Sequence, residues 1–393
     1  MTELAFAPSS ELGLCPDRLQ RLLDVLRADV DCGRLPGAVA LVARHGRIAL
    51  FESLGQLNPA AGTPMNREAI FRIYSMTKPV VSVAVMMLME QGKLLLSDPV
   101  FKHLPEFADQ KVAVERDGQV VLEDVQRPAT VQDLLRHTAG LTYEFLGTTA
   151  VQRQYAGQQM GSRERSNAEF SRVLAALPLM HQPGSVWEYS RATDVLGRLV
   201  EVVSGQSLGD YLREIILIPL GMIDTGFTVA ESAHHRIAEP FAHDPDGGVP
   251  MRVLDARRAT AMESGGGGLM STARDYARFL QFMLNRGELQ GVRLLGPHTV
   301  DFMTADHLDG LPSTGDLLPP GHGFGLGFAV RTATGVSPVP GSVGLYYWGG
   351  IAGTTFFVDP AQQLYALLMI QAPNQRDHYR PLFRSLVYAA LVD

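Results

Sequence analysis

The sequence predicts an α+β fold in which an antiparallel sheet is built from both ends of the chain and flanked by helices. Three observations predict it. Short apolar segments of strand length lie near both ends of the 393-residue chain, the middle is helical in pattern, and 46% of the residues are hydrophobic. We therefore expect residues 1–70 and 290–393 to form a sheet domain and residues 71–289 an inserted, mostly helical domain. The active site is expected in the cleft between them.

The first elements are a helix and a hairpin. Residues 16–31 carry leucines at helical spacing, which predicts an amphipathic helix. Residues 37–43 and 47–51 are apolar runs on either side of a turn at His45-Gly46, a pattern typical of a β-hairpin.

The later elements are helices first and then strands. Helical spacing predicts helices over residues 131–135, 171–177, 193–203 and 273–283. Apolar runs bounded by turn residues predict strands over residues 324–330, 344–348, 354–358 and 364–370. A closing helix is expected from about residue 376 to 391, and the stretch 308–321, rich in Gly and Pro, is expected to be a surface loop.

Composition excludes several classes of protein. A formal charge of −7 and the lack of a basic cluster argue against nucleic-acid binding. The segment Met1–Ala7 lacks the basic start and apolar run of a secretion signal, and no apolar run reaches membrane-spanning length. We expect a cytoplasmic protein in which Cys15 and Cys32 are free thiols. The sequence has no metal-binding pattern, so neither a metal nor a cofactor is predicted. The oligomeric state stays open.

Ser75 and Lys78 place a hydroxyl and an amine three residues apart at a helix start. Residues 79–89 are apolar on every face, as expected of a helix buried between two layers, and Gly92 is expected to close it. Ser75 is expected at or near the N-cap, and positions three apart share a helix face. Burial disfavours the charged form of a lysine, so Lys78 is a candidate base.

Two further segments carry residues suited to an active site. Tyr189 lies in a Pro- and Gly-containing loop directly before the helix predicted over 193–203, and a packed surface aromatic is the alternative interpretation. Gly349 and Gly350 follow Trp348 at a strand end, where glycines allow close backbone approach, plausibly to a ligand. A β-bulge is the alternative there.

The Ser75-Met76-Thr77-Lys78 motif, the tyrosine loop and Trp348-Gly349-Gly350 resemble the serine β-lactamase and penicillin-binding protein superfamily in order and spacing. Residues 92–100, 134–141 and 265–272 resemble its class C branch. The resemblance covers nearly the whole chain and is strongest to the β-lactamase-like carboxylesterases, called family VIII esterases. It implies the β-lactamase/transpeptidase-like fold and an acyl-enzyme formed on Ser75.

The chain departs from the superfamily pattern at two positions. The third motif usually carries a lysine or a histidine, but no lysine follows Lys111, and Trp348 occupies the position. An indole offers an apolar wall suited to neutral esters. The tyrosine motif usually ends in asparagine, where this chain has Arg191. Arg191 is therefore a candidate replacement for the missing cation, and with Trp348, Gly349 and Gly350 it forms the predicted substrate-binding set.

The resemblance also implies roles in the reaction. Ser75 would attack the ester carbonyl, and Lys78, Tyr189 or the pair would take its proton. Tyr189 would then protonate the leaving alcohol. The backbone N–H groups of Ser75 and Ile351 would form the oxyanion hole.

Two other motifs are set aside. Gly205-Gln206-Ser207-Leu208-Gly209 matches the lipase G-x-S-x-G pattern, but it follows a helical segment and is expected to be a turn between helices with Gly205 as the C-cap. His137 is expected to be a satisfied structural histidine.

The leading functional hypothesis is a serine carboxylesterase that hydrolyses small or short-chain neutral esters, with the small-molecule substrate as its partner. An acyltransferase is the second hypothesis, and a β-lactamase or D-amino-acid peptidase is the third. A penicillin-binding-like sensor is the non-enzymatic alternative.

Overall fold

The computed structural model of the chain describes residues 3–116 and 119–393. Its main element is an eight-stranded antiparallel sheet in the order β10-β11-β12-β13-β14-β1-β2-β3. Its strands are β1 (Gly37–Arg44), β2 (Arg47–Asn58), β3 (Thr63–Pro64), β10 (His322–Phe324), β11 (Ala329–Arg331), β12 (Tyr346–Gly349), β13 (Thr355–Asp359) and β14 (Leu364–Ile370). Because β1 pairs with β14, both ends of the chain build one sheet, as predicted.

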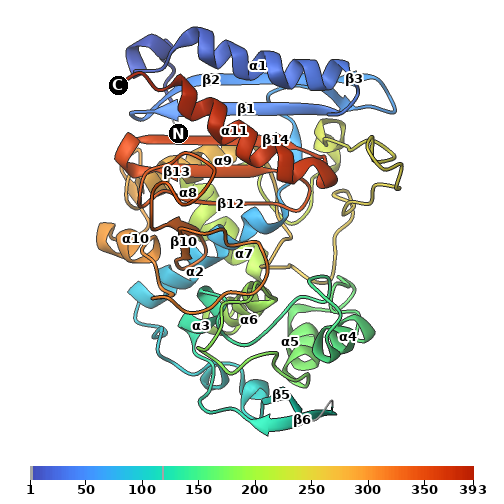
Figure 1. The fold of residues 1–393 in the computed structure, drawn as a ribbon. Helices are drawn as coiled ribbons and strands as arrows, with labels where there is room; N and C mark the ends of the chain where they lie inside the picture. The colour runs from blue at the N-terminus through green and yellow to red at the C-terminus, as the bar shows by residue number, and fades with distance from the viewer. Residues whose placement is uncertain (1–2, 117–118) are drawn as a thin grey trace.

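Helices cover both faces of this sheet. On one face lie α1 (Pro16–Asp31) and α11 (Arg376–Ala390), which contact each other, and on the other lies α9 (Ala273–Leu284). Successive side chains of a strand point to opposite faces. Ala38, Ala40 and Val42 of β1 accordingly pack with α1 and α11, whereas Val39 and Leu41 join the larger core with α9. Figure 1 shows α1 and α11 together in the half of the molecule that holds the sheet.

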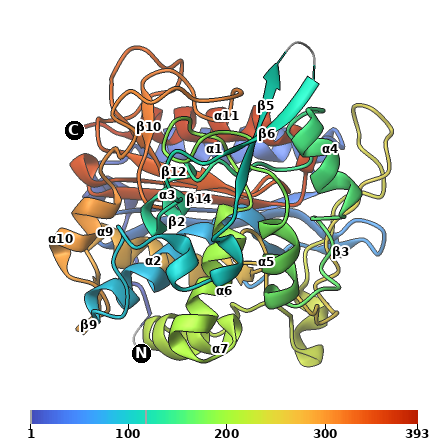
Figure 2. The same cartoon turned by 90° about the horizontal axis from the view of Figure 1, so that it is seen from below.

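The middle of the chain is mostly helical. It contains α2 (Thr77–Glu90), α3 (Val131–Leu135), α4 (Ala150–Gly157), α5 (Asn167–Ala175), α6 (Ala192–Ser204), α7 (Leu208–Leu212) and α8 (Ile218–Leu220). The remaining elements are α10 (Pro297–Met303) and the strand pairs β4 (Ile70–Arg72) with β7 (Met270–Thr272), β5 (Lys111–Arg116) with β6 (Gln119–Asp124), and β8 (Glu288–Leu289) with β9 (Val292–Arg293). Helices α2, α3, α5 and α6 lie below the sheet in Figure 1 and therefore on the near side of the molecule in Figure 2, which is seen from below. Helix α9 belongs by sequence to the segment 71–289, which we predicted to be the helical domain, but it packs against β14 and β1 of the sheet. The division of the chain into two domains stays a prediction.

Local signals explain where the sequence prediction differs from the structure. The strand predicted over 324–330 is wrong: the segment forms a tight turn between β10 and β11, closed by the Gly325 N–H donating to the Phe328 carbonyl at 2.8 Å. Gly327 has a φ of +100°, a conformation that favours glycine. Helix α5 begins at Asn167, before the predicted 171, because Ser166 and Glu169 form a capping box.

Helix α2 is buried on every face, as its apolar sequence predicts. All residues from Thr77 to Leu88 are buried. Ser75 lies in a single 3₁₀ turn (Tyr74–Met76), one residue before the N-cap Met76, and no side chain caps the helix. Gly92 follows the helix with a φ of +69°, which confirms the predicted closure.

Among the described residues, no helix combines the length and apolar character needed to cross a membrane. Cys15 and Cys32 are free thiols. Met1 and Thr2, part of the segment on which the compartment prediction rests, lie outside the described residues.

A buried carboxylate holds the start of α3, the helix that leads to His137. Asp133 forms a capping box with Thr130, and its oxygens accept from Arg127 Nη1 at 2.6 Å and Arg136 Nη2 at 3.0 Å. Burial raises the pKa of Asp133, but these hydrogen bonds outweigh it and bring the pKa to about 2. Asp133 therefore stabilises the fold as an anion.

We predict that Asp133→Ala lowers the free energy of unfolding by about 3–5 kcal/mol at pH 7, because two arginines lose a buried partner. Urea denaturation measures this. The folded pKa lies below the ordinary value of 3.8, so the contribution is present above 3.8 and is lost as the pH falls towards 2. Asp124→Ala, which removes an exposed carboxylate, should change stability little. Equal loss in both variants would contradict the role of Asp133.

Candidate active site

The segment before Ser75 has an unusual backbone. Tyr74 has a φ of +43°, in the left-handed region that non-glycine residues rarely adopt. The Leu254 N–H donates to Tyr74 Oη at 2.7 Å and holds the side chain. Such a conformation costs about 1–3 kcal/mol and persists where the surroundings enforce it. The turn sets Ser75 at the start of α2.

The structure brings Ser75, Lys78 and Tyr189 together. Tyr189 Oη donates to Ser75 Oγ at 2.6 Å, and Lys78 Nζ donates to the same oxygen at 3.4 Å. Lys78 Nζ also lies 4.5 Å from the centre of the Tyr189 ring. Tyr189 is 7% exposed, so the interpretation as a surface aromatic is wrong. The catalytic roles of the three residues stay a prediction.

Lys78 is an ammonium group held by polar partners. It is 1% exposed, and Nζ donates to the Gly266 carbonyl at 2.7 Å and to Tyr143 Oη at 3.0 Å. Burial lowers the pKa of Lys78, but Tyr143, Tyr189 and Asp194 outweigh it, and the net shift is upward. These partners favour the ammonium form, because an apolar helix does not imply apolar surroundings for its lysine. The role of Lys78 as a candidate base stays a prediction.

Asp194 and the glycine run at 265–268 complete the surroundings of Lys78. The Gly266 N–H donates to Asp194 Oδ1 at 2.9 Å. A Cβ atom on Gly266 would lie 2.8 Å from Asp194 Oδ2, so glycine is needed for this approach. Burial raises the pKa of Asp194, but the positive charges of Arg191 and Lys78 lower it by more, so the net shift of the pKa is downward. A buried anion thus faces the buried ammonium.

The loop that carries Tyr189 is anchored on both sides. The carboxylate of its neighbour Glu188 accepts hydrogen bonds from Thr142 Oγ1 and, at 3.2 Å, from Thr314 Oγ1. The same carboxylate pairs with His181 Nε2 at 2.6 Å. Trp348 Nε1 donates to Tyr189 Oη at 3.3 Å. The tyrosine hydroxyl is therefore held by the sheet as well as by its own loop.

His137 packs directly against the catalytic candidate Tyr189. Their ring centres are 5.0 Å apart, and His137 Nδ1 lies 3.1 Å from Ser190 Oγ. Burial lowers the pKa of His137 well below its ordinary value, so the ring is neutral. Its Nε2 has no hydrogen-bond partner in the part of the chain that the structure describes. The expected structural histidine is thus only half satisfied.

The Trp348-Gly349-Gly350 segment lies against the nucleophile turn. The pairs Trp348↔Phe356 and Gly349↔Thr355 continue one antiparallel register, so the β-bulge interpretation is wrong. A Cβ atom on Gly350 would overlap the Ile73 carbonyl, so the close approach is to protein backbone. Ile351 follows in an exposed turn. Its oxyanion role, and that of the Ser75 N–H, stay predictions.

The predicted substrate-binding side chains are more enclosed than expected. Trp348 is buried, with its ring centre 5.1 Å from that of Tyr189, so it supports the tyrosine as well as bordering the site. Arg191 forms ion pairs with Glu144 and with Asp194, the latter at 3.4 Å. The prediction that Arg191 replaces the missing cation is therefore corrected: its charge is already matched inside the protein.

The lipase-like motif is a turn between helices, as predicted. Gly205 caps α6 with a φ of +76°, and Ser207 is the N-cap of α7, where its Oγ accepts from the Asp210 N–H at 3.1 Å. This serine serves helix capping.

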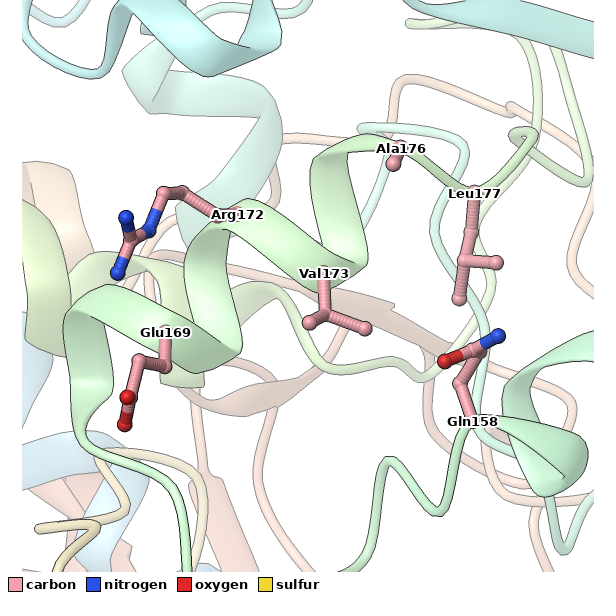
Figure 3. A pocket seen from close by; sticks show the side chains of 6 residues that line it. All are labelled: Gln158, Glu169, Arg172, Val173, Ala176 and Leu177. Atoms are coloured by element: carbon pink, nitrogen blue, oxygen red, sulfur yellow. The ribbon is translucent and has the colours of Figure 1, made fainter.

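Other candidate sites are weak. Within residues 3–116 and 119–393, no group of three or more His, Cys, Asp and Glu side chains is arranged to hold a metal ion. A shallow hollow lies between α5 and the end of α4 (Figure 3), lined by Gln158, Glu169, Arg172, Val173, Ala176 and Leu177. This lining includes no nucleophile and none of the predicted site residues.

Sequence reasoning missed three groups that contact Lys78 or its partners. Nothing in the sequence indicated a role for Tyr143, apart from its position shortly after the segment 134–141 that resembles the superfamily. Gly266 lies in a glycine run that matched the superfamily but received no role. Asp194, two residues into α6, was indistinguishable from an ordinary helix-start acid.

The fold and the site define the class. A Ser-x-x-Lys helix beside an antiparallel sheet built from both chain ends is typical of β-lactamase-like serine hydrolases. The chain belongs to the Beta-lactamase family, whose sequence profile matches residues 22–389.

Relatives narrow the activity. Esterase EstB of Burkholderia gladioli is 36% identical over 358 residues, covering 86% of each chain. The structure of EstCE1, a hydrolase with promiscuous acyltransferase activity, is similar with a TM-score of 0.79 and 28% identity, covering 96% of this chain and 98% of that one. The structure of simvastatin synthase LovD from Aspergillus terreus is similar with a TM-score of 0.78 and 25% identity, and the match covers 95% of this chain and 98% of that one. These comparisons confirm the predicted superfamily and the predicted fold. They also show that this chain is a carboxylic ester hydrolase of the β-lactamase-like type.

We predict that Trp348→Phe lowers kcat for ester hydrolysis about 3- to 10-fold with little change in KM, because Tyr189 loses one hydrogen-bond donor. Steady-state kinetics measure this. Trp187→Phe is the matched control, since Trp187 is buried and its Nε1 has no partner among the residues described. Equal losses in both variants would show that ring packing, and not the N–H group, matters.

Proposed function

We propose that the protein is a serine carboxylesterase that hydrolyses small or short-chain neutral esters through an acyl-enzyme on Ser75. The observation that carries this proposal is the 2.6 Å contact between Tyr189 Oη and Ser75 Oγ beside the Lys78 ammonium. A nucleophilic serine needs a group within hydrogen-bond reach that takes its proton, and Tyr189 meets that requirement.

Acylation would use Tyr189 in its phenolate form. The Lys78 ammonium, 4.5 Å from the Tyr189 ring, stabilises that negative charge. Tyr189 takes the proton of Ser75 as Ser75 Oγ bonds to the ester carbon, and the carbonyl oxygen becomes an oxyanion. The N–H groups of Ser75 and Ile351 are the proposed donors to it. The C–O bond to the alcohol then breaks, and Tyr189 gives its proton to the departing alkoxide.

Deacylation would repeat these steps with water. Tyr189 takes a proton from water, the hydroxide attacks the acyl carbon, and the carboxylic acid leaves as Tyr189 returns the proton to Ser75. Lys78 stays protonated throughout. Of the alternatives left open by the sequence, this scheme assigns the base role to Tyr189 and the electrostatic role to Lys78.

The two motif positions that differ from the superfamily favour neutral substrates. The position that usually carries a cation holds Trp348, no lysine follows Lys111, and Arg191 is paired with Glu144 and Asp194. A β-lactam or peptide carboxylate would therefore find no unpaired cation at these two positions, and the arginine that remains near them, Arg380, donates to the Gly350 carbonyl at 2.5 Å. For this reason we favour ester hydrolysis over β-lactamase and D-amino-acid peptidase activity.

Acyl transfer is a second candidate. The acyltransferase activity of EstCE1, a structural neighbour over nearly the whole chain, favours it. In that reaction an alcohol replaces water in the second step, and the same residues act. A small-molecule ester in the cytoplasm is the proposed partner in either case.

We predict that Ser75→Ala abolishes hydrolysis of p-nitrophenyl butyrate and the mass increase of the acyl-enzyme, because Ser75 Oγ is the proposed nucleophile and carries the acyl group. Ser207→Ala should retain wild-type activity, since Ser207 caps α7. Colorimetric rates and intact-mass spectrometry measure both. Turnover by Ser75→Ala at the wild-type rate would refute Ser75 as the nucleophile, whereas a wild-type protein with neither turnover nor an acyl-enzyme would support a binding protein.

We further predict that p-nitrophenyl acetate and butyrate are turned over faster than the octanoate, and that all three outpace a chromogenic cephalosporin. Addition of a small alcohol should yield some transesterified product, detected by gas chromatography. Efficient cephalosporin hydrolysis with negligible ester turnover would show that the loss of the cation at Trp348 was over-interpreted.

A further inference from the structure

We propose that Tyr143 is a positioning residue for the reaction, which holds the Lys78 ammonium beside Tyr189 and Ser75. This inference rests on the proposed function, because Tyr143 acts through Lys78. Tyr143 Oη is the side-chain oxygen nearest to Lys78 among its hydrogen-bond partners, at 3.0 Å, compared with 3.4 Å for Ser75 Oγ.

The ammonium has three N–H donors and three acceptors. They are the Gly266 carbonyl at 2.7 Å, Tyr143 Oη at 3.0 Å and Ser75 Oγ at 3.4 Å. When Ser75 Oγ bonds to the substrate, the weakest of these contacts changes. Gly266 and Tyr143 then remain to satisfy a charge that is nearly out of contact with water, where an unpaired donor is costly.

Tyr143 is itself held firmly. It is 5% exposed, and its ring stacks on Phe145 with 4.7 Å between ring centres. The Arg191 guanidinium carbon lies 4.7 Å from the Tyr143 ring centre, and Glu144 pairs with Arg191. Arg191, which replaces the asparagine of the superfamily motif, thus helps to clamp Tyr143.

The two tyrosines enclose Lys78 from two sides. Lys78 Nζ lies 5.3 Å from the Tyr143 ring centre and 4.5 Å from that of Tyr189, and the rings are 5.2 Å apart. Burial raises the pKa of Tyr143 to about 12, although Lys78 opposes this shift. Tyr143 therefore stays a neutral phenol at ordinary pH, and its oxygen accepts from the ammonium without cancelling the charge that Tyr189 requires.

Tyr143→Phe removes the acceptor and keeps the ring. We expect kcat for p-nitrophenyl butyrate to fall about 10- to 100-fold, the size expected for a lost hydrogen bond to a charged group, with KM within about twofold of wild type. The matched control is Tyr211→Phe, because Tyr211 is buried and its hydroxyl has no partner in the described ranges. Tyr211→Phe should keep wild-type kcat.

The pH profile separates positioning from a merely structural role. The proposed scheme uses the Tyr189 phenolate, which the Lys78 ammonium stabilises, so displacement of the ammonium in Tyr143→Phe disfavours the phenolate. The rise of kcat with pH should then lie at higher pH than in wild type. A lower kcat with an unmoved rise would overturn the proposal.

A second variant covers the case in which Tyr143→Phe fails to fold, as judged by circular dichroism. Phe145→Leu changes an exposed side chain and removes only the stacking on Tyr143. It should lower kcat about 2- to 5-fold and shift the rise of kcat with pH in the same direction. An active Ser75→Ala variant would refute the proposed function, whereas an inactive Ser75→Ala with wild-type behaviour of Tyr143→Phe and Phe145→Leu would refute the role of Tyr143 alone.

Discussion

The arrangement of the site depends on one constraint, the burial of a protonated lysine. An ammonium removed from water needs acceptors on all of its N–H groups and an anion nearby. Lys78 finds acceptors in Ser75, Tyr143 and the Gly266 carbonyl, and Asp194 is the nearby anion; the last three come from separate segments of the chain. Each segment must reach the same point, so the loop at 265–268 is glycine-rich and the start of α6 carries a buried carboxylate.

The position of Tyr189 joins the sheet to the helical part of the molecule. Its loop is anchored through Glu188, its ring packs on His137, and its hydroxyl contacts both Ser75 and Trp348. Trp348 lies in strand β12, and Gly350, directly after that strand, lies against the carbonyl of Ile73. Displacement of β12 would therefore move the nucleophile turn and its proposed base together, so the proton-transfer distance depends on the position of the sheet.

The two departures from the superfamily pattern, at positions 348 and 191, together change how charge is distributed at the site. Trp348 brings an indole where a cation is usual, and Arg191 brings a cation where an amide is usual, but the arginine is neutralised by Glu144 and Asp194. The ammonium of Lys78 is left as the charge directly beside Ser75. The Lys78 ammonium can stabilise negative charge that develops during reaction, while the two changed motif positions offer no unpaired cation to a substrate that is already anionic.

Much of this protein follows from local sequence patterns. Periodicity, turn residues and capping signals determined α1, the β1–β2 hairpin, α2 and the turn at Gly205, and the combination of Ser75-x-x-Lys78 with two distant motifs determined the superfamily. The turn at Gly325–Phe328 escaped because a short apolar run has the same composition in a strand and in a tight hairpin. Only the tertiary structure decided the charge state of Lys78, the pairing of Arg191 and the contact with Tyr143. Those properties depend on which groups meet across long sequence separations, and electrostatic free energies in a buried site change steeply over a few ångströms.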